Sequence, residues 1–518
     1  MHRKEIIMKK KICSIINFIR LEDHRMPEID HLEPVMEQMK LIGKYRFPAT
    51  WLMQTDAMLE GPYPELFRRE LPAGNELGIW LEITRLHCEA AGVEFRGRDG
   101  VNWDHHSQAS LTIGYRRSER IALVEASMKI FHEKFGYYPR SVAAWYLDAF
   151  TLGYLEEKYH ITATANCRDQ WGTDGYSIWG GFWAGAYYPS RGNANLPGED
   201  ESGQIRVPLF RMLGSCPVNQ YDSSLGENGQ GVCTLEPTAC KDPRWMKILF
   251  RNMFGNLATD YSYVQLGQEN SFGWPRMKDG YVMQMEELAK ACAAGEAEVM
   301  TMGDSGEWFL SNYRVTPPLA TVALEDPEPA GRQAFWYNSR YYRASLTRRG
   351  KHLALRDLHC FDNRYRETYL ESRCHTHAMI ADALPVVEGF LWQKNGVPAA
   401  MKIEIQDSGS WKEPEFDTLS VDTATDNRLE IMASGKNGTV FWCFTESSVM
   451  IRLDAGAPWR ILLPVNPEVF RRAEPEKLVF EHNGCVYETG LSGISGTDET
   501  ETAVLLEAAS GKAVHFYP

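Results

Sequence analysis

The chain has 518 residues and a formal net charge of -14 at pH 7. This length exceeds one ordinary domain, so we expect two or three domains and a large core. The acidic balance, with Lys and Arg scattered along the chain, excludes nucleic acid and anionic membrane surfaces as the main partners. The 15 Trp are typical of a protein that binds flat ligand faces as well as of one with a large core.

The 11 cysteines are dispersed and form no CxxC motif. This pattern predicts free thiols in a reducing compartment rather than a disulfide framework or a zinc cage. Residues 1–20 imitate a signal peptide, but their apolar stretch is short, contains Asn17 and lacks a small-residue cleavage site, so we interpret it as a first strand. No apolar run is long enough to span a bilayer. We therefore expect a soluble, cytoplasmic protein.

Residues 10–330 alternate between apolar strand patterns and amphipathic helix patterns. The strand patterns include KICSIINFIR, FPATWLMQT, NELGIWLEI, SVAAWYLD, ITATANC, SYVQLGQEN and EAEVMTMGD. Such alternation predicts a parallel sheet or barrel, with the functional site in the loops that follow the strands. Five carboxylates fall at expected strand ends, which converge on one mouth in a barrel: Glu22, Glu82, Asp148, Glu269 and Asp304.

Residues 335–518 show a different pattern. Apolar and polar residues alternate in segments such as KHLALRDLH and GTVFWCFTESSVMIRL, which are separated by Gly, Asn, Asp and Pro turns. Period-two alternation predicts antiparallel strands with one buried face. We expect an accessory domain of the β-sandwich type.

A long loop after the fifth strand pattern is rich in aromatic residues and glycine. Rings on a loop suit a shallow site that stacks on the flat faces of sugars, and packing of the loop onto the barrel is the alternative explanation. The candidate sugar-binding residues of this loop are Trp171, Trp179, Trp183, Tyr187 and Tyr188, with Arg191 and Asn193 at its rim. A second loop adds Trp103, Asp104 and His106, and Gln268 flanks Glu269.

Eight segments carry a resemblance to a known family: NFIRLED, FPATWLMQ, NELGIWLEI, GYYPRSVAAWYLD, CRDQWGTDGY, YYPSRGN, QENSFGW and SGEWF. With them, the chain resembles a little-characterised bacterial family of the glycoside hydrolase/deacetylase barrel superfamily. The resemblance implies a (β/α)7-type barrel, followed here by a C-terminal antiparallel β-sandwich. It also implies carbohydrate-active chemistry.

Within that superfamily, the resemblance implies a divalent metal for the polysaccharide deacetylases, held by an Asp-Asp pair after strand one and a His-x-x-x-His motif after strand two. This sequence has Glu22 and Asp23 at the first place, but Leu81–Ile83 where the histidines belong. We therefore expect no required metal. The alternative is a site of altered design made of Asp23, His24, His105 and His106, because histidine and carboxylate suit zinc.

Glycoside hydrolysis needs one carboxylic acid and a second carboxylate that acts as nucleophile or base. By position we favour Asp148 and Glu269 as this pair, with Asp304, Glu82 and Glu22 as supporting residues. For any one of them alone, a helix cap or a surface salt bridge is the competing explanation. The sequence therefore predicts a glycoside hydrolase that acts on oligosaccharides. A metal-dependent sugar deacetylase and a non-catalytic sugar-binding protein are the alternatives.

Overall fold

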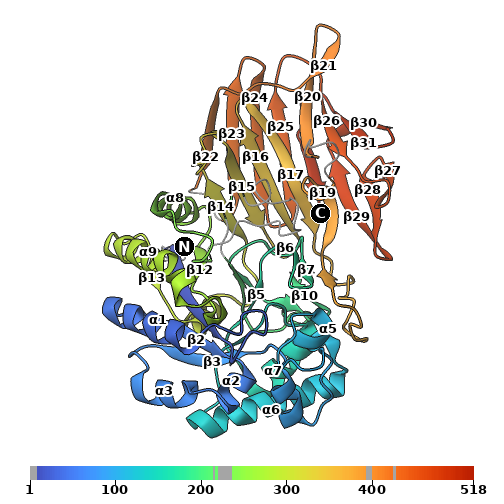
Figure 1. The fold of residues 1–518 in the computed structure, drawn as a ribbon. Coiled ribbons are helices and arrows are strands. Elements are labelled where there is room, and N and C mark those ends of the chain that lie inside the picture. Colours follow the sequence, from blue (N-terminus) through green and yellow to red (C-terminus); the bar gives the residue numbers. More distant parts are fainter. Residues whose placement is uncertain (1–8, 214–215, 220–235, 393–398, 424–426) are drawn as a thin grey trace, which may run out of the picture.

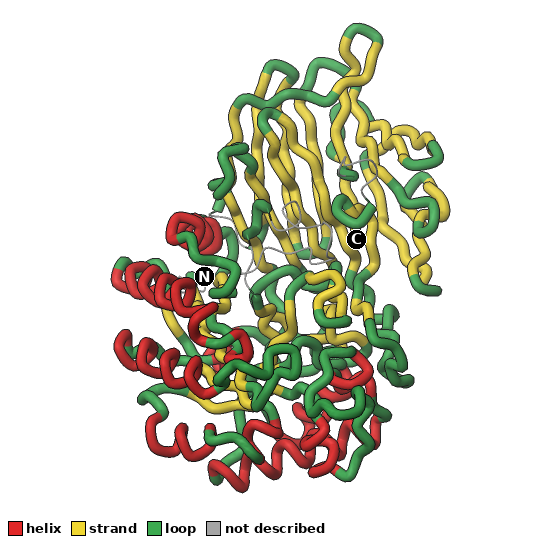
Figure 2. The backbone as a smooth tube through the Cα atoms, in the orientation of Figure 1, coloured by secondary structure: helices red, strands yellow, loops and turns green. Residues whose placement is uncertain are grey.

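The computed structural model of the protein describes residues 9–213, 216–219, 236–392, 399–423 and 427–518. Figure 1 shows an α/β part, which extends to the end of α10 at Asn312, and an all-β part stacked against one side of it. Helices gather at the outer side of the α/β part, whereas strands fill the other part (Figure 2).

A curled sheet of parallel strands forms the core of the α/β part. Its order is β12-β1-β2-β3-β4, and β13 also pairs with β1. The bounds are β1 Lys10–Ile19, β2 Thr50–Met53, β3 Glu76–Trp80, β4 Val142–Ala143, β12 Tyr261–Leu266 and β13 Glu298–Val299. Because neighbouring strands and helices cover both faces of β1, its residues from Ile12 onward are all buried.

The curl continues beyond β4 into a second group of strands. Val142 N donates to Ala163 O (3.3 Å) and Ala144 N to Ala165 O (3.4 Å), which joins β4 to β5. β5 (Thr164–Cys167) pairs in parallel with β11 (Leu209–Met212), which pairs in antiparallel fashion with β8 (Ala186–Tyr187). β11 reaches β12 through a hydrogen bond from Leu213 N to the Gln265 side chain (2.7 Å), although no backbone pairing joins these two strands within the described ranges.

The helices and the short strands complete the α/β part. The helices are α1 Leu32–Tyr45, α2 Thr55–Leu59, α3 Tyr63–Glu70, α4 Arg85–Ala91, α5 Ser107–Ser110, α6 Arg117–Phe135, α7 Ala149–Tyr159, α8 Pro243–Phe254, α9 Trp274–Ala293 and α10 Met302–Asn312. Two 3-10 turns, η1 Thr112–Gly114 and η2 Asn270–Phe272, and the strands β6 Gln170–Thr173, β7 Tyr176–Ile178, β9 Pro189–Ser190 and β10 Asn193–Pro197 lie in the connecting loops.

Two antiparallel sheets form the all-β part and confirm the expected sandwich-like region. The first has the order β14-β15-β16-β17-β20-β26-β31-β30, with β19 beside β17 and β21 beside β20; the second has the order β22-β23-β24-β25-β32-β29-β28-β27. Residues along strands such as β26 alternate between buried and half-buried, as expected for sheets with one covered face.

The strands of the first sheet are β14 Leu319–Ala323, β15 Gln333–Asn338, β16 Tyr342–Arg349, β17 His352–Cys360, β19 Leu384–Glu388, β20 Met401–Asp407, β21 Ser410–Lys412, β26 Trp459–Pro464, β30 Ile494–Glu499 and β31 Ala503–Ala508. Those of the second are β22 Thr418–Asp422, β23 Leu429–Gly435, β24 Gly438–Thr445, β25 Ser448–Asp454, β27 Phe470–Glu474, β28 Lys477–His482, β29 Cys485–Ser492 and β32 Val514–Tyr517.

The aromatic loop of the α/β part packs directly against the β part. Trp183 stacks on Trp336 of β15 with the ring centroids 4.3 Å apart. β18 (Met379–Ala381), which follows β17 in the chain, pairs in parallel with β7. One hydrophobic core therefore runs through both parts.

Two predictions about the whole chain can be compared with the structure. The ten cysteines in the described ranges are all free thiols, as expected. None of the described helices combines the length and apolar character needed to cross a membrane.

Candidate active site

A buried arginine lies at the centre of the strand ends. Arg20 directly follows β1 and is fully buried. Its Nε and Nη2 donate to the two carboxylate oxygens of Glu82, at 3.1 and 3.2 Å, and its Nη1 lies 2.9 Å from Glu269 Oε2. Asp23 approaches the same Nη1 at 3.7 Å. The carboxylates that follow β1, β3 and β12 therefore converge, as expected for the strand ends of a barrel. They converge on the guanidinium group of Arg20 rather than on an open mouth.

Glu269 is brought to Arg20 by a sharp bend after β12. Gly267 has φ 112°, and a Cβ there would lie 2.0 Å from the carbonyl oxygen of Ile16, so the chain passes closer to β1 than a side chain permits. Glu269 is 4 % exposed. Burial raises its pKa to about 8, with smaller increases from Glu236, Glu82 and Asp174, although Arg20 opposes this shift. Glu269 is thus mainly protonated at neutral pH.

Glu269 lies on the wall of a pocket of about 680 Å³. The wall residues follow the carboxyl ends of β1, β4, β5, β11 and β12, where the alternation of strands and helices predicts the site. They are Arg25, Met26, Trp145, Gln170, Thr173, Asp174, Tyr176, Leu213, Glu236, Ala239, Cys240, Lys241, Asp242, Trp245, Glu269, Phe272 and Arg276. This volume is in the range of pockets that bind small molecules. The pocket combines aromatic rings with charged groups of both signs.

The other predicted catalytic carboxylates take different places. Glu82 is 1 % exposed, supports Arg20 and also accepts hydrogen bonds from Gln54 (2.7 Å) and Trp80 (3.0 Å). Glu22 is exposed on the loop after β1. Neither is part of the pocket wall.

Asp148 does not meet Glu269, in contrast to the predicted pair. It is the N-cap of α7, where its carboxylate accepts from Thr151 N (3.0 Å). It also accepts from Thr112 Oγ1 (2.6 Å) and pairs with Arg120 (2.9 Å). The oxygens of Asp148 thus cap a helix and form an ion pair with an arginine. A helix cap or a salt bridge is the explanation that competes with a catalytic role for a single carboxylate.

Asp304 lies at the opposite end of the sheet. β13 ends at Val299, and α10 begins at Met302, so Asp304 is a residue of the first helical turn rather than of a strand end. Its neighbour Gly303 donates its N–H to Glu76 at the start of β3 (2.8 Å), and Asp304 itself pairs with Arg140, just before β4 (3.0 Å). The prediction that Asp304 faces the mouth is therefore wrong.

The aromatic loop does not form an exposed platform. Trp179, Trp183, Tyr187 and Tyr188 are each at most 2 % exposed, and Trp171 is half-buried against Trp179 (6.0 Å between centroids). Their polar atoms are used inside the protein: Tyr187 Oη donates to Ala194 O (2.6 Å) and Tyr188 Oη to Tyr313 O (2.8 Å). The rings are packing residues, as the alternative explanation stated, but they pack against the β part as well as onto the α/β part: Tyr188 contacts Phe309 of α10, and Trp183 contacts Trp336 of β15.

The remaining predicted binding residues also lie outside the pocket wall. Arg191 pairs with Glu156 on the surface (3.0 Å), and Asn193 is buried and donates to Tyr365 O (3.3 Å). Gln268 is also buried, and its Oε1 accepts from Thr238 N (3.4 Å). Trp103 is buried beneath Arg20, whose Cζ lies 4.1 Å from the ring centroid. Asp104 accepts from Arg98 (3.0 Å) and pairs with His106 (3.0 Å).

The predicted alternative metal set does not converge. Asp23 is bound by Arg25 at 2.7 Å. His24 stacks on His105 (6.0 Å between centroids), and His105 lies against His106 (4.5 Å). The three histidine rings lie together, but their nitrogen atoms and the oxygen atoms of Asp23 do not meet at one point. Within the described ranges, the ligand atoms of one group do meet, namely those of Asp357, His359 and Glu388.

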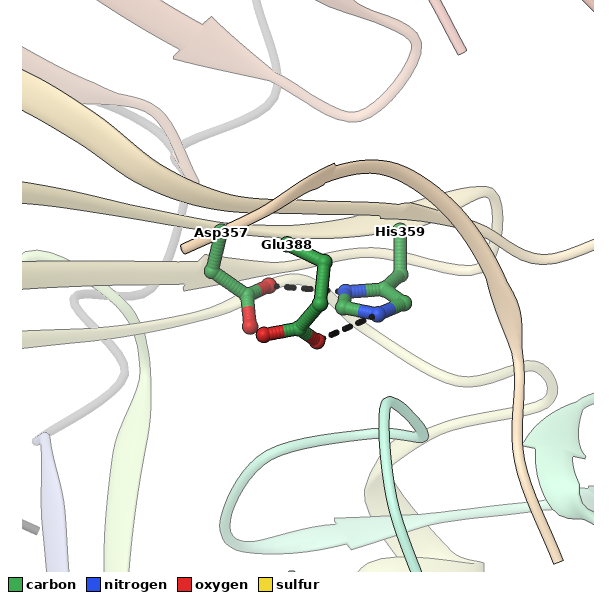
Figure 3. A group of neighbouring side chains, drawn as sticks. All are labelled: Asp357, His359 and Glu388. Carbon is green, nitrogen blue, oxygen red and sulfur yellow. Dashed lines mark hydrogen bonds and ion pairs between the residues drawn. The ribbon is translucent and has the colours of Figure 1, made fainter. Parts of the chain in front are cut away.

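That group lies in the β part, as Figure 3 shows. Asp357 and His359 belong to β17, and Glu388 belongs to β19. The His359 ring lies between the two carboxylates, with Nδ1 3.1 Å from Asp357 and Nε2 3.2 Å from Glu388. Burial opposes charge on the ring, but the two carboxylates prevail and raise its pKa to about 9. With both nitrogens protonated, the ring is a cation that directs one N–H to each carboxylate.

The same group connects the two parts of the molecule. Arg343 pairs with Asp357 (2.7 Å) and with Asp169 of the α/β part (2.7 Å), and Trp179 Nε1 donates to Glu388 (2.6 Å). All of these side chains are buried. We interpret this group as a structural ion network.

Sequence reasoning found Glu269 and missed its surroundings. Arg20 has a recognisable signal, because it is a single charge that directly continues an apolar strand. Trp145 follows β4 in the same way and contributes a pocket ring. Trp245 and Arg276 belong to helices α8 and α9, and no local pattern connects them to Glu269.

Comparisons with known proteins support the fold. No family model matches the sequence, and a search of curated proteins finds no match. The structure is similar to a candidate glycoside hydrolase/deacetylase of Parabacteroides distasonis, with a TM-score of 0.57 and 15% identity over 76% of this chain and 94% of the other. This likeness confirms the expected fold resemblance.

Weaker likenesses link the chain to candidate polysaccharide deacetylases of Mycobacterium smegmatis and Pseudomonas aeruginosa PAO1. Both have TM-scores of 0.37, with identities of 13% and 12%; they cover 63% and 59% of this chain and 97% and 93% of their own.

Proposed function

We propose that this protein is a carbohydrate-active hydrolase that works in the pocket beside Glu269, and that its reaction removes an acyl group from a sugar. The fold likeness to a candidate glycoside hydrolase/deacetylase supports the general class. The observation that carries the proposal is Glu269 itself, a buried carboxyl group on a pocket wall whose pKa of about 8 lies near neutral pH. The proposal takes up the deacetylase alternative to the glycoside hydrolase expected from the sequence, but it does not include the metal of that alternative.

The chemistry follows from the protonation of Glu269. Water adds to the acyl carbon to give a tetrahedral intermediate. As the bond to the departing oxygen or nitrogen breaks, protonated Glu269 gives its proton to that atom, and the resulting carboxylate takes up the proton that the attacking water brought, which restores Glu269. The attack of water on the acyl carbon creates negative charge on the carbonyl oxygen. Lys241 and Arg276 on the pocket wall supply positive charge to stabilise it.

Glycoside hydrolysis remains the second candidate because of one observation. The pocket wall also carries the carboxylates of Asp174, Glu236 and Asp242. Any of them paired with protonated Glu269 provides the acid and the second carboxylate that a glycosidase needs. Asp148, the partner favoured from the sequence, is not among them.

The finer architecture belongs to the same proposal. The approach of β11 to β12 through Gln265 supports closure of the curled sheet as a (β/α)7-type barrel within residues 10–330. Residues 335–518 then form the accessory β-sandwich-like domain. The free thiols support the proposed cytoplasmic location.

The test measures two products from the same protein. Acetylated chitooligosaccharides and aryl glycosides are incubated with the wild-type protein, Glu269→Gln, and Glu65→Gln as a matched control on the exposed side of α3. We expect acetate release that falls by about 10²-fold or more in Glu269→Gln and is retained in Glu65→Gln. Cleavage of aryl glycosides without acetate release selects the second candidate. Sugar binding without turnover identifies a non-catalytic binding protein, and full activity in Glu269→Gln refutes the role of this residue.

A further inference from the structure

Deacetylases of the superfamily that this chain resembles use a divalent metal, and the residues at the corresponding place do not fit one. We propose that Arg20 takes the place of this metal: its guanidinium is a permanent cation at the centre of the strand-end carboxylates, and the barrel site binds no divalent ion. The proposal rests on the proposed function for the importance of Glu269, but its test does not require activity.

One oxygen of Glu82, Oε2, is fully committed to other donors, and the other, Oε1, is bound to Arg20. Oε2 accepts from Arg20 Nε, Gln54 and Trp80, at 3.1, 2.7 and 3.0 Å, and Oε1 accepts from Arg20 Nη2 at 3.2 Å. An oxygen that accepts three hydrogen bonds has no lone pair left for a metal. Glu82 is also buried, so no water replaces these donors.

The oxygens of Asp23 are occupied in the same way. Oδ1 accepts from the backbone N (2.9 Å) and the Nε (3.0 Å) of Arg25, and Oδ2 accepts from Arg25 Nη2 (2.7 Å). Although burial opposes ionisation, these hydrogen bonds and the charge of Arg20 lower the pKa of Asp23. The carboxylate that would bind a metal in the deacetylase motif is therefore charged but neutralised by arginine.

Arg20 itself cannot leave this position without a large loss of contacts. Its three nitrogens all contact oxygen atoms, including Ser271 Oγ at 3.3 Å, and Trp103 covers its face. An arginine stays charged at every pH at which the protein is folded. A dication placed among the same carboxylates would meet this fixed positive charge at short range and in a buried site, where the repulsion is strong.

The histidines near this place are only partly occupied. His24 Nε2 lies 2.9 Å from Arg98 Nη2, and His106 pairs with Asp104. The buried Nδ1 atoms of His24 and His105 make no hydrogen bond within the described ranges, but the ligand atoms of these histidines do not meet those of Asp23 at one point. Arg20 thus does two things that a metal would do at this place: it neutralises the carboxylates and it holds Glu269 in position. Because Arg20 is fully buried and does not reach the pocket wall, it is a positioning residue that acts through Glu269.

The first experiment is elemental analysis of the protein after dialysis against Zn²⁺ or Mn²⁺ and removal of unbound ions, with the melting temperature measured with and without chelator. We expect no equivalent of metal that depends on Asp23 or Glu82, and no shift in melting temperature on chelation. One equivalent of metal that is lost in Asp23→Asn or Glu82→Gln overturns the proposal. If metal remains bound in these two variants but is lost in His359→Gln, the metal lies at the group of Asp357, His359 and Glu388. That result supports the proposal, because the site around Arg20 then holds no metal.

The second experiment tests the cation directly. Arg20→Met leaves Glu82 and Glu269 without their shared cation, while Arg25 still binds Asp23. Because the positive charge that repels a dication is then gone, we expect this variant to gain one equivalent of Zn²⁺ or Mn²⁺. Arg120→Met is the matched control, since Arg120 is an equally buried arginine whose one ion-pair partner in the described ranges is Asp148, and we expect no gain. A folded Arg20→Met that binds no more metal than Arg120→Met contradicts the proposal.

The pKa of Glu269, followed by NMR of ¹³C-labelled glutamate, provides a further measurement. We expect it to rise in Arg20→Met and to return toward the wild-type value in Arg20→Lys. An unchanged pKa in Arg20→Met also contradicts the proposal. If neither variant folds, the elemental analysis of the wild-type protein decides. If the protein hydrolyses no sugar derivative, the proposed function is refuted, but the metal measurements still test whether Arg20 takes the place of a metal.

Discussion

Replacing Glu269 by Gln should make the protein more stable at alkaline pH. Gln has nearly the shape of protonated Glu but cannot ionise. Glu269 is 4 % exposed and has a pKa of about 8 in the folded protein, compared with an ordinary value of 4.5. Between these two pH values the unfolded chain has released this proton, whereas the folded protein still holds it.

The sign and size of the effect follow from proton linkage. A carboxyl group that keeps its proton only when folded lowers the free energy of unfolding as the pH rises. One proton corresponds to about 1.4 kcal/mol per pH unit. Over the interval from pH 4.5 to 8, proton release by this glutamate in the unfolded chain therefore lowers the free energy of unfolding of the wild-type protein by roughly 4 kcal/mol. Glu269→Gln has no proton to release at this position, so its free energy of unfolding does not fall in this way. The difference between the variant and the wild type should therefore be near zero at pH 5 and largest at pH 8 and above.

The assay is urea unfolding of the wild-type protein, Glu269→Gln and Glu65→Gln at a series of pH values from 5 to 9. Glu65 is exposed, and its replacement controls for the loss of one negative charge. We expect the difference in the free energy of unfolding between Glu269→Gln and the wild type to grow with pH, and the Glu65→Gln difference to stay flat. A pH-independent difference would show that Glu269 ionises normally and would remove it as the proton donor of the proposed reaction.

Two further predictions concern the ion network and the pocket wall. His359→Gln should lower the free energy of unfolding by about 3 to 5 kcal/mol below pH 6.5, because it leaves the buried carboxylates of Asp357 and Glu388 without their cation. The loss should shrink as the pH rises through about 9, where the wild-type ring itself loses its proton, and a constant loss in urea unfolding would contradict this assignment. Trp245→Ala removes a ring of the pocket wall and should weaken the binding of acetylated chitooligosaccharides, measured by calorimetry, by about tenfold. Trp308 is a half-buried ring outside the pocket wall, so Trp308→Ala should leave the affinity unchanged. Equal affinities of the two variants would show that the sugar binds elsewhere.

The sequence by itself determined the order and type of the main elements. The long apolar run at β1 predicts a strand covered on both faces, and it is buried from Ile12 to Ile19. The alternation after residue 335 predicts antiparallel strands, and two such sheets are present. Both predictions depend on burial along a single segment, which local periodicity records. Glu269 was found by the same means, because it lies just beyond a strand.

Only the tertiary structure decided which of the strand-end carboxylates meet. Asp148 and Glu269 both follow strands, yet one caps a helix and the other lines a pocket. Asp304 was assigned to a strand end, but β13 stops at Val299 after pairing only with Ile12 and Cys13 near the start of β1, so the first turn of α10 lies at the opposite end of the sheet. The meeting of Arg20 with Glu82 and Glu269 joins residues 62 and about 250 positions apart in the chain. Such contacts depend on strand register and on the close passage at Gly267, which are set by packing of the whole sheet rather than by any local pattern.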